Sequence, residues 1–166
     1  GAAVTVVDED ALVLGASTVT GAYTITAGGA VTDEGTQEIT GITTITAQNS
    51  SSVNQAVTLN TATNNFADEV RITGAAVTVV DEDALVLGAS TVSGNLAATA
   101  TAGNMTDEGV LTIAGTSAFT TSADGAAISF NENHAFTGAV TITTNDSAGS
   151  DSDATITAGD GAKLIF

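Results

Sequence analysis

The chain has 166 residues and carries 19 acidic but only two basic side chains, so that its formal net charge is −17 at pH 7. This charge excludes nucleic acids as partners, because binding to phosphates requires clustered Lys and Arg, and it disfavours anionic membrane surfaces. The absence of Cys excludes disulfides and thiolate metal sites, and the apolar runs are too short to insert into a bilayer.

Short runs in which an apolar residue alternates with Thr predict β-strands from the first residues onward. In chain order these runs lie at 4–6, 22–26, 42–46, 56–59 and 140–143. Clusters of Gly, Asn, Asp and Ser between them, such as 27–29 and 49–52, are typical of turns. No stretch has apolar residues at helical spacing, so we expect an all-β chain.

A long internal repeat organises the sequence. Residues 1–19 recur without change at 74–92, and weaker matches continue after them, for example from Phe66 to Phe136. We therefore predict one domain over residues 1–166, made of supra-repeats 1–73 and 74–143 and of a partial, degenerate copy at 144–166. Tandem identity of this kind is typical of solenoids, in which each unit contacts only its neighbours.

Two kinds of all-β architecture accommodate short strands with turns at every corner, an antiparallel sandwich or barrel and a solenoid. A sandwich needs large side chains to fill the space of about 10 Å between its sheets, and aromatic residues make up only 4% of this chain. We therefore predict a right-handed parallel β-helix with roughly 20–24 residues per coil. About three such coils per supra-repeat would return the identical segments to one side of the solenoid, roughly 14 Å apart.

The run VTV…DEDALVLG…STVTG, followed by TITAGGAVTDEG and AVTLN…NNFADEV, resembles the β-strand repeats of filamentous-haemagglutinin-like bacterial adhesins. The resemblance covers most of residues 1–145. It implies a right-handed parallel β-helix displayed outside the cell, at the cell surface, with a role in adhesion, aggregation or matrix building. The amino-terminal secretion domains of that family carry Asn-Pro motifs, and this chain has no Pro, so it resembles the fibrous shaft of such proteins.

Acidic clusters at predicted turns are the candidate calcium ligands, because Ca²⁺ takes six to eight oxygen ligands. The glycine-rich calcium nonapeptide and the EF-hand spacing are both absent, so we favour solvated turns and expect that no cofactor is required. The candidate ligands are Asp8, Glu9, Asp10, Asp81, Glu82, Asp83, Asp151 and Asp153.

No catalytic residues are predicted, because the acidic clusters are duplicated with the repeat and lack neighbouring aromatic platforms for sugars. A polysaccharide-active β-helix enzyme and an ice-binding solenoid, the latter suggested by Thr-Ile-Thr at 24–26 and 44–46, are weaker alternatives. We expect His134 to be a turn residue. The expected turn or ladder residues are Asn60, Asn64, Asn65, Asn131 and Asn133.

These patterns predict an extracellular structural or adhesive solenoid that builds a surface fibre by head-to-tail stacking, or that continues a longer shaft. Unpaired strands at the ends of a solenoid invite another chain to add on. The expected junction consists of Val4 and Val6 on one copy and of Ile156, Leu164, Ile165 and Phe166 on the next. The alternative is an adhesin module that depends on calcium or binds host or matrix glycans.

Overall fold

The computed structural model describes residues 2–145, 152–159 and 163–165 of the chain, which form β-strands and no helix. Within this part of the chain, no helix has the length and hydropathy that a bilayer crossing requires. Most strands contain three to five residues, because Gly, Asn and Asp interrupt each apolar–Thr alternation after that length.

In chain order the strands are β1 (Val4–Asp8), β2 (Leu12–Leu14), β3 (Ser17–Val19), β4 (Tyr23–Ala27), β5 (Val31–Asp33), β6 (Gln37–Ile39), β7 (Thr43–Ala47), β8 (Val57–Leu59), β9 (Asn65–Phe66), β10 (Val70–Gly74), β11 (Val77–Asp81), β12 (Leu85–Leu87), β13 (Ser90–Val92), β14 (Leu96–Ala100), β15 (Met105–Asp107), β16 (Leu111–Ile113), β17 (Ser117–Asp124), β18 (Ile128–Phe136), β19 (Ala139–Asn145), β20 (Ala154–Ala158) and β21 (Lys163–Ile165).

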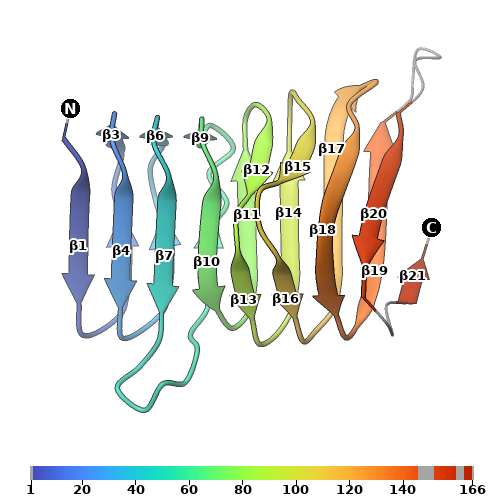
Figure 1. Ribbon diagram of the computed structural model, residues 1–166. Helices are drawn as coiled ribbons and strands as arrows, with labels where there is room; N and C mark the ends of the chain where they lie inside the picture. Colours follow the sequence, from blue (N-terminus) through green and yellow to red (C-terminus); the bar gives the residue numbers. More distant parts are fainter. Residues whose placement is uncertain (1, 146–151, 160–162, 166) are drawn as a thin grey trace.

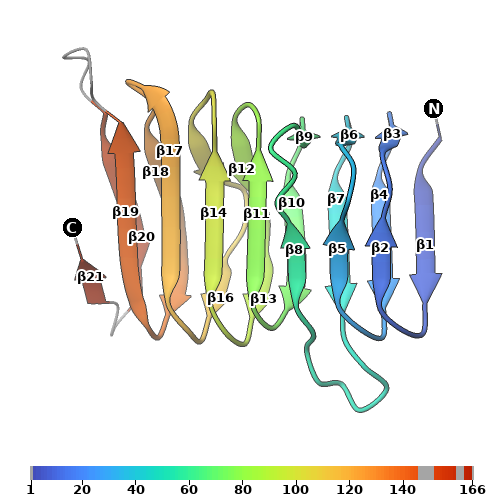
Figure 2. The same ribbon diagram turned by 180° about the vertical axis from the view of Figure 1, so that it is seen from behind.

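Every pairing between these strands is parallel, and each sheet runs along the stack (Figure 1). Sheet A begins β1-β4-β7-β10, continues through the short strands β12 with β13 and β15 with β16, and ends at β18 and β20. Sheet B, which faces the reader in Figure 2, runs β2-β5-β8-β11-β14-β17-β19-β21. The short sheet C consists of β3-β6-β9.

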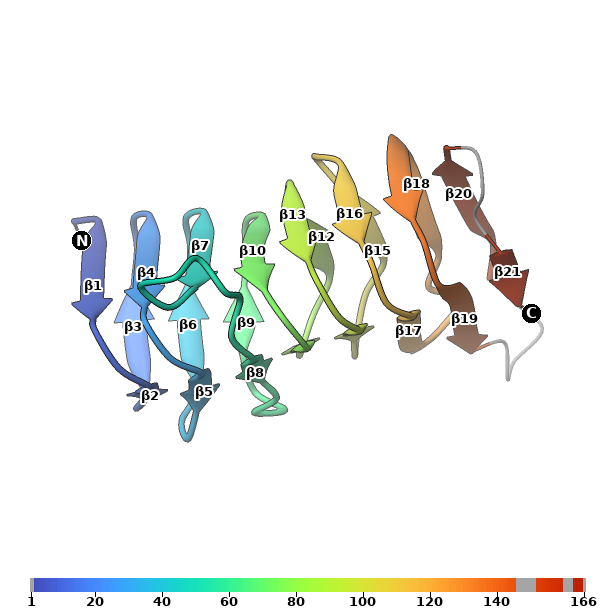
Figure 3. The same ribbon diagram turned by 90° about the horizontal axis from the view of Figure 1, so that it is seen from below.

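The chain winds as a right-handed solenoid, as predicted. In Figure 1 it descends along sheet A in front, rises along sheet B behind and advances from left to right, which is a right-handed path. The strands stack in about seven coils of about 20 residues. Seen from below in Figure 3, the strands of sheet A lie along one side of the stack and those of sheet B along the other.

Side chains that point inward form one continuous core. In β4, for example, Tyr23, Ile25 and Ala27 are buried, whereas Thr24 and Thr26 face outward, because successive side chains of a strand point to opposite sides. The core of the second supra-repeat is more aromatic. Phe119 packs edge-to-face against Phe130, with ring centroids 4.7 Å apart, and against Phe136 at 5.9 Å.

The corners between strands tolerate little side-chain bulk, since each corner lies directly on that of the neighbouring coil. Gly28, which follows β4, donates its N–H to the carbonyl oxygen of Asp8 at 2.9 Å. A Cβ atom at this position would collide with the carbonyl oxygen of Glu9. Glycine here therefore permits the close axial approach of two coils.

The prediction that the identical segments return to one side of the solenoid is wrong. Three coils of sheet A lead from Val4 to Val70, whereas the copy of Val4 is Val77, seven residues further along the chain. As a result β1 belongs to sheet A and its copy β11 to sheet B. The connection between β7 and β8, which projects from the stack in Figure 1, lengthens the third coil.

Candidate functional site

The N-terminal end of the stack is an open rung. Within the described residues β1 pairs only with β4, and its other edge has no strand beside it. Val4 is 37% exposed, whereas the same residue in the interior copy, Val77, is 2% exposed. Val6 is partly buried, and its copy Val79 is fully buried. Because the two segments are identical in sequence, this difference arises from position in the stack alone.

The interior copy shows what normally covers this rung. Strand β8 lies on β11 in register, with Val57 opposite Val77 and Leu59 opposite Val79. At the following corner Asp81 accepts backbone N–H groups from Phe66 at 2.9 Å and from Asp83 at 2.8 Å. At the open end Asp8 accepts the equivalent local bond, from the N–H of Asp10 at 2.9 Å.

The other end of the stack also exposes part of its core. Strand β20 pairs with β18 in sheet A, and β21 pairs with β19 in sheet B. Ile142, Ile156 and Ala158 pack against the core but are only partly buried. Of the predicted junction residues, Phe166 lies outside the described residues, as do the side chains of Leu164 and Ile165.

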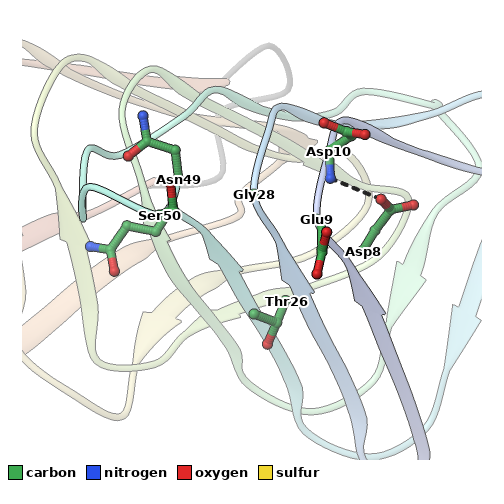
Figure 4. A pocket seen from close by; sticks show the side chains of 8 residues that line it. Asp8, Glu9, Asp10, Thr26, Gly28, Asn49 and Ser50 are labelled. Carbon is green, nitrogen blue, oxygen red and sulfur yellow. Dashed lines mark hydrogen bonds between the residues drawn. The ribbon is translucent and has the colours of Figure 1, made fainter.

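The first acidic turn borders a surface hollow of about 620 Å³. Figure 4 shows the carboxylates of Asp8, Glu9 and Asp10 on one side and Asn49 and Ser50 on the other, with Gly28 between them. The lining residues are Asp8, Glu9, Asp10, Thr26, Gly28, Gln48, Asn49 and Ser50.

The calcium ligands predicted from the sequence do not converge in the described residues. Across that part of the chain, no three His, Asp or Glu side chains gather as a metal would require. The two triplets lie on different corners, because Asp8 ends strand β1 of sheet A and Asp81 ends strand β11 of sheet B. Asp153 is exposed, and Asp151 lies outside the described residues. A role for calcium therefore stays a prediction.

Two buried clamps, one in each supra-repeat, join successive coils. The first clamp consists of Asp33, Asn64 and the backbone of Gln37. The Asn64 side chain donates from Nδ2 to Asp33 Oδ2 at 2.6 Å and accepts the Gln37 N–H at Oδ1, at 2.9 Å. Asp33 also accepts the N–H groups of Asn60 at 2.9 Å and Thr61 at 3.2 Å. Both side chains are thereby satisfied without water.

The second clamp repeats this pattern with histidine in place of asparagine. His134 Nδ1 accepts the Leu111 N–H at 3.0 Å, and Nε2 lies 3.2 Å from Asp107 Oδ2, although without the alignment of a strong hydrogen bond. Asp107 accepts the N–H groups of Asn131 at 2.9 Å and Glu132 at 3.1 Å. The expectation that His134 is a turn residue is therefore wrong: it is fully buried within β18.

The second clamp holds its imidazole in the neutral form. Burial lowers the pKa of His134, and the nearby carboxylates of Asp107 and Glu132 oppose this effect only in part. Because Nδ1 accepts the Leu111 N–H, the single proton of the neutral ring belongs on Nε2, which faces Asp107.

Asp81 is the second titratable group that burial perturbs. Removal from water raises the pKa of Asp81 to about 6, and the charges of Asp83 and Glu82 act in the same direction. The backbone N–H groups of Asp83 and Phe66 oppose the increase, because they stabilise the carboxylate. This environment exists because another coil covers the Asp81 corner.

The sequence contains a signal for the clamps when the two supra-repeats are aligned, although the acidic clusters alone do not reveal it. Asn64 and His134 each stand two residues before an equivalent phenylalanine, Phe66 or Phe136. Aspartate occupies equivalent positions in the matching segments 32–35 and 106–109. A polar residue kept beside a core phenylalanine in both copies predicts a buried, hydrogen-bonded side chain.

Comparison with known proteins identifies a family but no characterised relative. No curated protein and no solved structure matches the chain. One family, described as Repeats of unknown function (DUF5649), matches it over residues 1–73 and again over residues 74–143. These two matches cover most of the chain, and the chain therefore belongs to the family of Repeats of unknown function (DUF5649).

Proposed function

We propose that the chain is a structural building block of an extracellular fibre, in which the solenoid continues end to end from one unit to the next. The open rung at β1 carries this proposal. The counterparts of its residues Val4 and Val6 inside the stack, Val77 and Val79, are buried. An edge strand with uncovered apolar side chains favours pairing with a further strand.

The arrangement of the sheets supports continuation of the solenoid from one unit to the next. Sheet A has β1 at one end and β20 near the other, and sheet B has β2 and β21 in the corresponding places. A head-to-tail contact would therefore extend both sheets at once. Such a contact joins different surfaces of the two units, so it produces open fibres rather than closed dimers.

The test is end-to-end association of the purified chain and of two variants with one added charge. Val6→Asp places the charge among the inward-facing residues of the open rung, whereas Thr5→Asp places it on the exposed outer side of the same strand. We expect fibres or long oligomers from the unmodified chain and from Thr5→Asp, and monomers from Val6→Asp, by sedimentation and electron microscopy. Monomers of the unmodified chain at high concentration, with calcium and without it, would contradict end-to-end stacking.

The second candidate function is adhesion that depends on calcium or on glycans. The unmodified chain and the two variants test it as well. Association that requires calcium and disappears with a chelator would favour the calcium-dependent adhesin. Binding of immobilised glycans by the Val6→Asp monomer would assign adhesion to the side of the solenoid, since its end is blocked.

A further inference from the structure

Inside the stack, the sequence of the N-terminal strand occurs a second time, and there a preceding coil covers it. Residues 74–92 repeat residues 1–19 without a change, and the coil at 53–73 precedes them directly. Every contact between this coil and the interior copy therefore predicts a contact for the coil that would cover β1.

These contacts begin along the strands. Strand β8 supplies Val57 and Leu59, which lie opposite Val77 and Val79. The backbone carbonyl of Gln55 accepts the Ala75 N–H at 2.7 Å, and the N–H of Val57 donates to the carbonyl of Ala76 at 2.9 Å. These residues of the interior copy correspond to Ala2, Ala3, Val4 and Val6 at the open end.

The contacts continue around the acidic corner, where the coil at 53–73 supplies Asn64 and strand β9 (Asn65–Phe66). The Phe66 N–H donates to Asp81, and the carbonyl of Asn64 accepts the Glu82 N–H at 2.7 Å. The side-chain amide of Asn65 donates to Asp83 Oδ2 at 3.2 Å. The corresponding residues at the open end are Asp8, Glu9 and Asp10.

We propose that the N-terminal end of the stack is a docking surface for a preceding coil of the 53–73 type, that is, for the end of another copy of the same repeat. This inference rests on the proposed function, because it names the unit that continues the solenoid at β1. The C-terminal strand β20, with the sequence Ala-Thr-Ile-Thr-Ala, contains no counterpart of Asn64 and Asn65, which contact the acidic corner. A coil of the 53–73 type therefore complements residues 8–10 better than β20 does.

The experiment adds coils to the intact chain. A second copy of residues 53–73, fused directly before Gly1, recreates the junction that the interior contains between Thr73 and Gly74. One control extension carries Val57→Asp and Leu59→Asp in the added copy, and the other is the coil at 22–42, which has the same length but contains no asparagine. Hydrogen exchange of residues 4–8, followed by mass spectrometry under dilute conditions, reports whether β1 is covered.

We expect the 53–73 extension to slow exchange of residues 4–8 by about tenfold or more, because their amides gain a neighbouring strand. The extension with two aspartates should leave exchange as fast as in the unmodified chain. Equal protection by the 22–42 extension would overturn the selectivity for the 53–73 coil while leaving end-to-end stacking intact. Fast exchange with every extension, together with monomers of the unmodified chain, would overturn both proposals.

Discussion

Asn64 and His134 hold equivalent positions in the two clamps, but only His134 can change its charge. Because burial lowers its pKa, the unfolded chain takes up a proton at higher pH than the folded chain does. The stability that the second clamp contributes is therefore complete above the ordinary histidine pKa of 6.5 and is lost as the pH falls below it. A protonated Nδ1 could no longer accept the Leu111 N–H.

The variant His134→Asn copies the first clamp into the second and should remove this dependence. We expect it to unfold more easily at pH 8, by about 1 kcal/mol, because a smaller side chain leaves a cavity beside Phe130 and Phe136. Between pH 7 and 5 the wild type should lose stability relative to this variant, as measured by urea denaturation. Asp81, whose raised pKa favours the folded state as the pH falls through about 6, affects both proteins alike. Parallel pH profiles of the two proteins would contradict the assignment.

Strands β1 and β11 have the same sequence, but β1 lies at the end of the stack and β11 inside it. The cost in stability of one substitution can therefore be compared between the two places. Val79→Ala removes fully buried atoms from the stack and should cost about 2 kcal/mol. Val6→Ala, in the partly buried copy, should cost less than about 1 kcal/mol when the protein is dilute and monomeric. Urea unfolding of the two variants tests this difference, and equal losses would mean that the open rung is covered in solution.

The strands were predictable from the sequence because alternation decides which side chains face inward. The runs at 22–26 and 42–46 correspond to β4 and β7 within one residue, and their Thr and Ile side chains alternate as expected. The relation between the two copies was not predictable, because periodicity does not show how many residues each corner consumes. Strand β10 takes the next place in sheet A after β7, so the copy of β1, which follows β10 along the chain, lies in sheet B.

For the candidate site, the sequence identified Val4 and Val6 as inward-facing residues of an end strand, but it did not identify the clamps. Apolar residues that alternate with threonine face the core wherever the strand lies, so these two assignments need no knowledge of the stacking register. Asn64 becomes a clamp residue only because its coil lies on that of Asp33, a contact that depends on the register. His134 looked like a turn residue because Asn131, Glu132 and Asn133 precede it, but they face outward from β18.

At the scale of the whole molecule, a net charge of −17 opposes both folding and the approach of a second copy. Arg71 is paired with Glu69 in the same strand region, so it neutralises little of the surface beyond its own neighbour. Salt shortens the range of the repulsion from about 30 Å at 0.01 M to about 8 Å at physiological ionic strength. Both the thermal midpoint and the extent of end-to-end association should therefore rise with NaCl.

Sedimentation and thermal unfolding at increasing NaCl test this expectation, and CaCl₂ at matched ionic strength separates screening from binding. If the acidic turns are solvated, the two salts should act alike, because screening depends mainly on ionic strength. A much larger effect of CaCl₂, reduced by replacing the exposed Asp10 with Asn but not by replacing the exposed Glu38 with Gln, would instead indicate a specific ion at the first acidic turn. Association that weakens as NaCl rises would contradict an apolar junction between like-charged units, since screening weakens an assembly only when attraction between opposite charges holds it together.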